Sequence, residues 1–317
     1  MVKHGNNNLQ ASKNAKSDEF YTQISFIENE LKHYKNYFKD KIVFCNCDDP
    51  EWSNFWKYFH INFYHLGLKK LISTHYDEER PSYKMEVVAI DNAEGQLALP
   101  EYIQTPLKEN GDFRSKECME IMKEADIIIT NPPFSLFREY IAQLMEYKKQ
   151  FLIVGNLNAV KYKEILPLIM ENKVWLGANS GHFWFRVPDY YEEKKTDFKI
   201  DEKGVKWRRM GNICWFTNLD YEERYEDIIL YKTYDPNIYP KYDTYNAYEV
   251  SKVSDIPCDM PLDTVFGVPI TFITKYNPKQ FEIVGVLNSG SGNEYDLAKA
   301  VVNGKQLYAR FLIRRKK

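Results

Sequence analysis

The first half of the chain alternates short apolar runs with longer stretches of helical periodicity. The apolar runs predict β-strands at residues 41–45, 68–74, 85–90, 125–130 and 150–155. The stretches around them predict helices, for example over 18–37, 52–66, 118–124, 137–148 and 161–171. Strands that alternate with helices are typical of an α/β protein with a parallel sheet. Because such sheets bind ligands at the carboxyl ends of their strands, we expect the functional groups there.

The pattern changes twice further along the chain. After residue 172, aromatic-rich runs at 173–179, 181–188 and 211–219 predict strands that extend the sheet in antiparallel orientation. From about Tyr221 the composition shifts to tyrosine, proline and lysine, and strands are expected at 269–273 and 281–287. We therefore predict a main domain over 18–220 and a smaller region over 221–317. Residues 1–17 contain three lysines and no acid, which fits a flexible basic arm or a terminus without a role.

Composition narrows the class of protein. With 317 residues, 44% hydrophobic and 28% charged, the chain is typical of a globular protein, and it lacks an apolar run of the ~20 residues that cross a bilayer. No signal peptide is apparent and the five cysteines form no disulfide framework, so we expect a cytoplasmic protein. Cys45 and Cys47 fit zinc ligation less well than burial in a strand, and no metal is predicted. Since 43 basic residues face 45 acidic ones, only local basic patches would attract a nucleic acid.

The most informative segment is Asn131, Pro132, Pro133 and Phe134, which follows the strand expected at 125–130. Two consecutive prolines lack N–H donors and fix φ, so the backbone stays extended. The side-chain oxygen of Asn131 and the carbonyl oxygen of Pro132 can then accept both hydrogens of one planar NH2 group, while Phe134 stacks on the base that carries it. Such a site makes an amine more nucleophilic without a metal or an ionised base. The alternative is a proline-containing loop after a buried strand.

The segment resembles the NPPF motif of the amino-methyltransferases of DNA. From DEFYTQ through CNCDDP, GDFRS and ITNPPFS to GNICWFTNL and GVPITF, nearly the whole chain is similar to the EcoRI-type adenine-specific DNA methyltransferases. The resemblance implies a Rossmann-like S-adenosylmethionine-dependent catalytic domain over 18–220 and a target-recognition region over 221–317. It also implies transfer of a methyl group from S-adenosylmethionine to the N6 amine of an adenine flipped out of duplex DNA.

The same resemblance indicates where the cofactor binds. One departure is the segment after the first strand, where these enzymes usually have a glycine-rich turn and this chain has none. Either Asp48 or Asp49 would meet the cofactor there, or cap the following helix. Asp77 is the candidate for the ribose hydroxyls, and Asp112 for the adenine amine of the cofactor. The expected cofactor contacts are Phe20, Tyr21, Thr22, Cys45, Asn46, Asp48, Asp49, Pro50, Asp77, Asp112 and Phe113.

Two basic segments are candidates for holding DNA. They are 206–209, in the aromatic-rich middle of the chain, and 299–317, which contains seven basic residues and no acid. Base-specific reading is expected from 231–248 and 275–280. The alternative is that these charges only form a solvated face. The expected contacts with DNA are Lys206, Arg208, Arg209, Lys275, Arg314 and Arg315.

Other readings of the chain stay open at this point. The acceptor amine can also belong to an RNA adenine or a protein glutamine, because both present the same NH2 geometry. A DNA-binding subunit without activity would explain the glycine-free turn. Gly285, Gly290 and Gly292 form a second glycine-rich segment, which we interpret as a solvent loop because too few residues follow it. We expect a bacterial or phage-encoded monomer, with a cognate restriction endonuclease that need not bind it stably.

Overall fold

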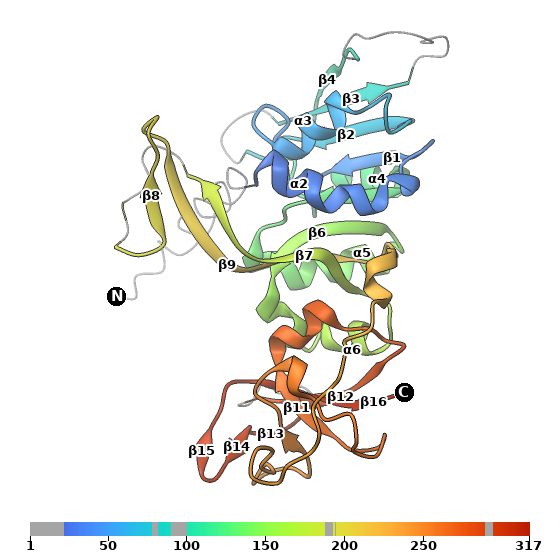
Figure 1. Cartoon of the computed structure of the whole chain (residues 1–317). Helices are drawn as coiled ribbons and strands as arrows, with labels where there is room; N and C mark the ends of the chain where they lie inside the picture. The colour runs from blue at the N-terminus through green and yellow to red at the C-terminus, as the bar shows by residue number, and fades with distance from the viewer. Residues whose placement is uncertain (1–21, 78–81, 90–99, 188–192, 194, 289–293) are drawn as a thin grey trace, which may run out of the picture. The chain divides into compact units, whose positions relative to one another are not determined.

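The computed structural model describes residues 22–77, 82–89, 100–187, 193, 195–288 and 294–317 (Figure 1). Its contacts divide the chain into two compact units. The first unit contains the described residues up to Asn156 together with Asn179–Leu219. The second contains Leu157–Ala178 and Asp220–Lys317, so a segment from the middle of the chain joins the C-terminal region.

A nine-stranded sheet forms the centre of the first unit, in the order β4-β3-β2-β1-β5-β6-β9-β7, with β8 beside β9. The four central strands, β2, β1, β5 and β6, are parallel. On one edge β3 and β4 are antiparallel, and on the other β9 is antiparallel to β6. The strands are β1 (Ile42–Cys45), β2 (Lys70–Thr74), β3 (Tyr83–Val88), β4 (Ile103–Pro106), β5 (Ile127–Thr130), β6 (Gln150–Asn156), β7 (Trp175–Arg186), β8 (Phe198–Ile200) and β9 (Lys206–Thr217).

The predicted α/β sheet is confirmed, with one difference in strand direction. The third predicted strand, β3, runs antiparallel to β2 rather than parallel. Only residues 75–82 separate these two strands, which is too short for the crossover that a parallel neighbour needs. The antiparallel extension predicted from the aromatic-rich runs is confirmed for β9, whose residues Trp215 and Phe216 pair with Val154 and Ile153.

The predicted helices of the first unit are present with different bounds: α3 and α5 are shorter than predicted, whereas α4 begins two residues earlier than predicted. Ser53 accepts a hydrogen bond from the amide of Phe55 and starts α3, and Ser115 accepts one from Cys118 and starts α4. Of the predicted helix at 18–37, residues 18–21 lie outside the described residues, the helix begins at Ile24 after the extended Gln23, and it becomes a 3-10 helix at its end. The helices are α2 (Ile24–Leu31), η1 (Lys32–Tyr37), α3 (Asn54–Ile61), α4 (Lys116–Glu124), η2 (Phe134–Leu136) and α5 (Phe137–Glu146).

The second unit is built on a five-stranded sheet in the order β10-β11-β16-β12-β13, with a separate hairpin of β14 and β15. The predicted strand at 281–287 is present as β12. The predicted strand at 269–273 is wrong, because the strand ends at Pro269 and residues 270–275 form a 3-10 helix. The elements are η3 (Leu157–Lys161), α6 (Leu166–Met170), η4 (Glu222–Tyr225), β10 (Tyr248–Glu249), η5 (Val253–Asp255), β11 (Phe266–Pro269), η6 (Ile270–Lys275), β12 (Phe281–Leu287), β13 (Asp296–Ala298), β14 (Val301–Val302), β15 (Lys305–Gln306) and β16 (Arg310–Arg315).

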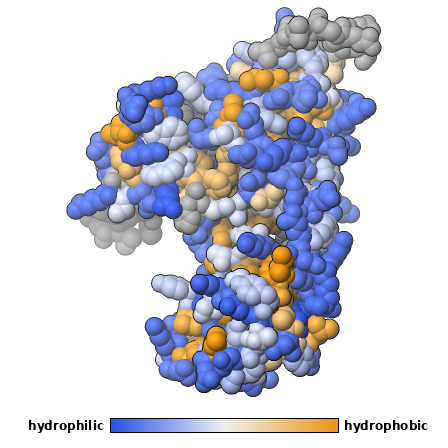
Figure 2. Space-filling view, in the orientation of Figure 1, coloured by the Kyte–Doolittle hydropathy of each residue, from blue (hydrophilic) through white to orange (hydrophobic). Residues whose placement is uncertain are grey.

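Hydrophilic side chains predominate on the face shown in Figure 2, where apolar residues form small groups. This distribution agrees with a mean hydropathy of -0.55. Within the described ranges, no helix has the length and apolar character needed to cross a bilayer. All five cysteines are free thiols, and only Cys258 is exposed.

A substitution of Gly155 would test the packing between β6 and α5. A methyl group built on Gly155 would lie 2.7 Å from the ring of Phe137 and 2.8 Å from that of Phe216. We expect Gly155→Ala to lower the free energy of unfolding by about 1–3 kcal/mol through overpacking, as measured by urea denaturation. Adding Phe137→Leu should recover part of that loss, so a strictly additive double variant would contradict the steric explanation.

Candidate active site

The site lies where the order of the parallel strands reverses. β1 is flanked by β2 on one side and by β5 on the other, and the chain visits β2 first. In open α/β sheets, ligands bind at the carboxyl ends of the strands where the strand order reverses in this way. Asn46 follows β1 and Asn131 follows β5 at this edge. The fold therefore brings together two of the segments that the sequence marked for the site.

A buried carboxyl group joins the two segments. Asp48 is 1% exposed, and its Oδ1 accepts a hydrogen bond from Ser53 Oγ at 3.0 Å. Its Oδ2 accepts from the backbone amide of Asn131 at 3.2 Å and from the hydroxyl of Thr130. Burial raises the pKa of Asp48 to about 7, because these hydrogen bonds offset only part of the desolvation. Asp48 thus fixes the position of the backbone where the Asn-Pro-Pro-Phe segment begins.

The side chain of Asn131 is oriented from a second direction. Its Nδ2 donates to Thr22 Oγ1 at 3.3 Å, and the carbonyl oxygen of Thr22 accepts from Asn54 Nδ2 at 2.6 Å. The segment before α2, the start of α3 and the end of β5 therefore converge on one amide group. Thr22 is buried and lies beside the acceptor motif, whereas Phe20 and Tyr21 lie outside the described residues.

The backbone of the motif continues in an extended conformation at Pro133. Pro132 is buried, Pro133 is extended with φ -57° and ψ 125°, and Phe134 starts η2 and is half-buried. Asn131 is only 5% exposed, so an acceptor amine reaches its oxygen only if the groups around it move. The helix predicted to begin near Phe137 begins there as α5.

The turn after β1 carries a buried hydrogen-bond donor without an acceptor among the described residues. Asn46 is 1% exposed; its Oδ1 accepts from the hydroxyl of Tyr140, whereas its Nδ2 has no partner. Leaving such a group unpaired costs about 1–3 kcal/mol, which makes it a candidate for a ligand contact. Cys45 and Pro50 are buried beside it, and burial raises the pKa of the Cys45 thiol well above its usual value.

Three titratable side chains, His75, Asp49 and Asp77, lie close together next to the end of β2. His75 Nδ1 lies 2.8 Å from Asp49 Oδ2, its Nε2 lies 3.8 Å from Asp77 Oδ2, and its ring stacks on Tyr83 at 4.8 Å. The hydrogen bond to Asp49 and both carboxylate charges raise the pKa of His75 against the opposing effect of burial. His75 thereby holds Asp49 and Asp77 near the strand end where the ribose contact was expected.

Gly111 places Asp112 and Phe113 close to the same strand end. It has φ +77°, and a Cβ there would overlap the carbonyl oxygen of His75. Phe113 is buried and meets the ring of Tyr140 edge-on at 5.0 Å. Asp112 binds Arg114 with both oxygens, at 2.8 and 2.7 Å. Burial raises the pKa of Asp112, but the bonds from Arg114 outweigh it and hold that pKa below its usual value.

Four of the six basic residues expected to hold DNA make contacts within their own units. In the first unit, Arg208 donates to the carbonyl oxygens of residues 196 and 197, and Arg209 lies 3.5 Å from Asp197; Lys206 begins β9. In the second, Arg314 pairs with Glu282 and Arg315 donates to two carbonyl oxygens. Lys275 is exposed at the end of η6. Contacts of these residues with DNA stay predictions.

Sequence reasoning did not single out Thr130, Ser53 and Tyr140. The sequence offered only weak signals for the first two residues: Thr130 is the polar last residue of an apolar strand, and Ser53 directly precedes a predicted helix position. Tyr140 carried no signal, because its role depends on the helix face that packs against Asn46.

Comparison with known proteins decides the family. The family model described as adenine-specific methyltransferase EcoRI matches residues 8–316. The chain belongs to this family. It is therefore an adenine-specific methyltransferase, and the mixed sheet agrees with the fold of enzymes that use S-adenosylmethionine.

Three relatives of this methyltransferase cover most of its length. The Type II methyltransferase M.EcoRI of Escherichia coli is 45% identical over 100% of this chain and 99% of its own. M.MgeORF184P of Mycoplasma genitalium is 37% identical over 96% of this chain and 97% of its own. M.MpnI of Mycoplasma pneumoniae is 38% identical over 87% and 84%, respectively. No solved structure matches the chain.

The raised pKa of Asp48 predicts a pH-dependent stability. In the unfolded chain the carboxyl loses its proton near pH 4, and in the folded chain at about 7. The stabilisation is thus complete below pH 4, falls as pH rises, and is lost above about 7. We expect Asp48→Asn to reduce the pH dependence of the unfolding free energy, measured by urea denaturation between about pH 5 and 8. Glu202→Gln, an exposed carboxylate, is the control; equal slopes in both variants would refute the assignment to Asp48.

Proposed function

We propose that this methyltransferase modifies the N6 amine of an adenine in duplex DNA, with S-adenosylmethionine as methyl donor. The observation that carries the proposal is the convergence on Asn131, whose backbone is held by Asp48 and whose side-chain amide is held by Thr22. Fixing both ends of one side chain keeps its oxygen in a constant direction. Such preorganisation is what an acceptor for an amine hydrogen requires.

The residues at the strand ends fit a polar cofactor. Asn46 offers a buried donor, Asp49 and Asp77 offer carboxylates at the end of β2, and Phe113 offers a buried ring. When bound, S-adenosylmethionine supplies an electrophilic methyl group on a sulfonium ion. Because Arg114 occupies both oxygens of Asp112, we assign the cofactor contact at this turn to Phe113 and the backbone rather than to that carboxylate.

The chain's contribution to the reaction is to hold and polarise the amine. The oxygens of Asn131 and Pro132 would accept its two hydrogens, which moves electron density toward the nitrogen. Phe134 would stack on the base, and Pro133 keeps the backbone extended. Since Asn131 is 5% exposed, entry of the base requires local movement around Thr22 and η2. The flipping of the adenine out of the duplex is part of this proposal.

The division into two compact units suggests separate roles. We infer that the first unit binds the cofactor and performs the transfer, and that the second reads the DNA sequence. The names of the relatives place them among Type II methyltransferases, which favours DNA over RNA or protein as the acceptor. An enzyme with this substrate acts in the cytoplasm, and a cognate restriction endonuclease would act on the same DNA without a stable complex.

Asn131→Ala tests the role of the acceptor oxygen. We expect a loss of about 10²- to 10³-fold in kcat, because the amine loses a preorganised hydrogen-bond acceptor, whereas the calorimetric affinity for S-adenosylmethionine changes little. Asn131→Asp retains an oxygen at this position and should keep part of the rate. Methyl transfer to duplex DNA is the readout, and wild-type turnover in Asn131→Ala would exclude the proposed role. No methyladenine in DNA treated with the wild-type protein would instead exclude DNA as the acceptor.

A further inference from the structure

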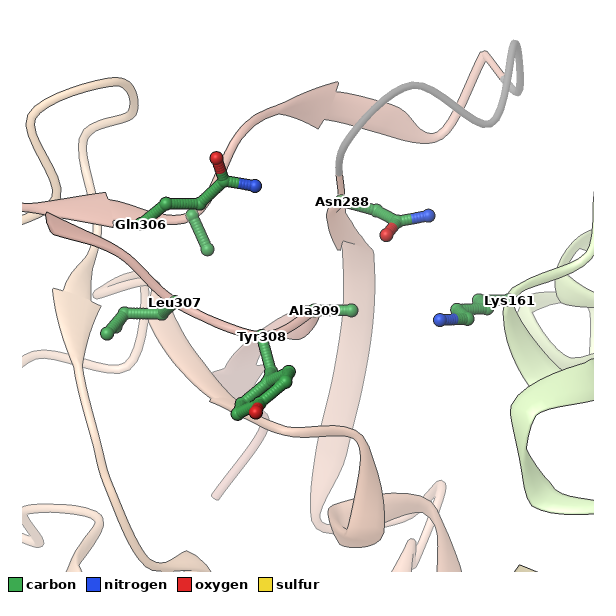
Figure 3. Close-up of a pocket in the computed structure, with 7 residues that line it drawn as sticks. Lys161, Asn288, Gln306, Leu307, Tyr308 and Ala309 are labelled. Atoms are coloured by element: carbon green, nitrogen blue, oxygen red, sulfur yellow. The ribbon is translucent and has the colours of Figure 1, made fainter.

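A polar cavity of about 230 Å³ is lined wholly by residues of the second unit (Figure 3). The residues that line it come from three parts of this unit. Lys161 ends η3, Asn288 follows β12, and Gln306 and Tyr308 lie in and after β15. Figure 3 shows the amine of Lys161 directed toward the space between these elements. The remaining lining residues are Ala300, Leu307 and Ala309.

The polar groups at this cavity are available to a ligand. Within the described part of the chain, the side chains of Lys161, Asn288, Gln306 and Tyr308 make no hydrogen bond or ion pair. Tyr308 is 91% exposed, although a tyrosine ring is a large apolar surface. An ammonium group, two carboxamides and an aromatic ring together match the groups that proteins use on phosphates, base edges and base faces.

The backbone that presents these side chains is firmly held. The turn of the β14–β15 hairpin is bound by Asp243, whose two oxygens accept from the amides of Asn303 at 3.1 Å and Gly304 at 2.7 Å. Leu307 donates its amide to Ala300 at 2.7 Å and packs against the buried cluster around Leu287 and Leu312. Leu307 is half-buried, whereas its neighbours Gln306 and Tyr308 are exposed.

The end of β12 is fixed in the same way. The amide of Asn288 donates to the carbonyl oxygen of Ala298 at 2.9 Å and to Asp296 Oδ1 at 3.0 Å. The backbone that carries the two carboxamides is thus held by hydrogen bonds on both sides of the cavity. Recognition of one base edge requires this rigidity, since it depends on the direction of two hydrogen bonds.

We propose that this cavity reads an adenine-containing base pair of the recognition sequence in the major groove. Gln306 and Asn288 hydrogen-bond the base edge, for which carboxamides have the matching donor and acceptor. Lys161 contacts a backbone phosphate, and Tyr308 packs on the sugar or base beside it. The proposal rests on the proposed function, because it assigns the sequence-reading site of the same DNA methyltransferase. It places base reading in Asn288 and Gln306 rather than in 231–248 or 275–280.

The test begins with the sequence that the wild-type protein methylates. DNA containing randomised sites is treated with each protein and then sequenced for modified adenines. We expect Gln306→Ala and Asn288→Ala to accept substitutions at one A·T pair, and kcat/KM on the wild-type site to fall about ten- to a hundredfold. Calorimetric affinity for S-adenosylmethionine should be unchanged in both variants, which also shows that they fold. Gln104→Ala, an exposed glutamine in β4, is the matched control.

Lys161→Ala gives an independent readout. We expect weaker binding to all duplexes alike, with the slope of log affinity against log salt reduced by about one, because one phosphate contact is lost. Lys163→Ala, two residues further on and outside the cavity, should leave the slope unchanged.

The outcomes separate this proposal from the proposed function. If the wild-type protein and the carboxamide variants methylate the same sequence with kcat/KM within about twofold of one another, the cavity does not read DNA, although the methyltransferase activity stands. If the wild-type protein methylates no DNA, both proposals fail. If only Lys161→Ala has an effect, the cavity holds the backbone and the base-reading assignment is overturned.

Discussion

The hydrogen bonds to the buried carboxyl group of Asp48 are the constraint on which the site depends. They join the turn after β1 to the start of the Asn-Pro-Pro-Phe segment after β5, and also to the cap of α3. Each of these elements is positioned by its own strand or helix, and Asp48 connects all three. A buried carboxyl with a pKa raised to about 7 is a costly group, and its retention at this point fits a requirement for exact placement of the backbone.

The glycine-free turn after β1 is stabilised by the neighbouring strand. The hydroxyl of Ser73 donates to the carbonyl oxygen of Cys45 at 3.0 Å and to that of Asp48, and Thr74 donates to the carbonyl oxygen of Asn46 at 3.3 Å. Polar residues at the end of β2 therefore satisfy carbonyl groups that would otherwise be buried unpaired. Side-chain hydrogen bonds stabilise this turn, whereas the related enzymes use the conformational freedom of glycine there. The absence of glycine is therefore no strong reason to interpret the turn as a lost cofactor site.

The second unit uses most of the positive charge of its C-terminal segment internally. β16 lies in the middle of its sheet, where Arg310 pairs with the buried Glu249 at 3.2 Å, and Lys317 pairs with Asp227 at 2.7 Å. Three of the seven basic residues, Arg310, Arg314 and Lys317, thus pair with acids from distant positions, and Arg315 and Lys316 donate to carbonyl oxygens. At the cavity of Lys161, the other polar side chains that line the space are two carboxamides and a tyrosine.

The sequence alone determined the central strands, the position of the motif after β5 and the family. These features depend on local hydrophobic periodicity, on the backbone restrictions of proline and on a nearly continuous similarity. Only the tertiary structure decided that β3 runs antiparallel, that 270–275 leaves the sheet and that Leu157–Ala178 joins the C-terminal unit. It also decided which partners Asp48, Asp112 and Arg314 have. Partner choice depends on groups that are distant in sequence and meet only when the chain is packed, so neither composition nor spacing along the chain contains that information.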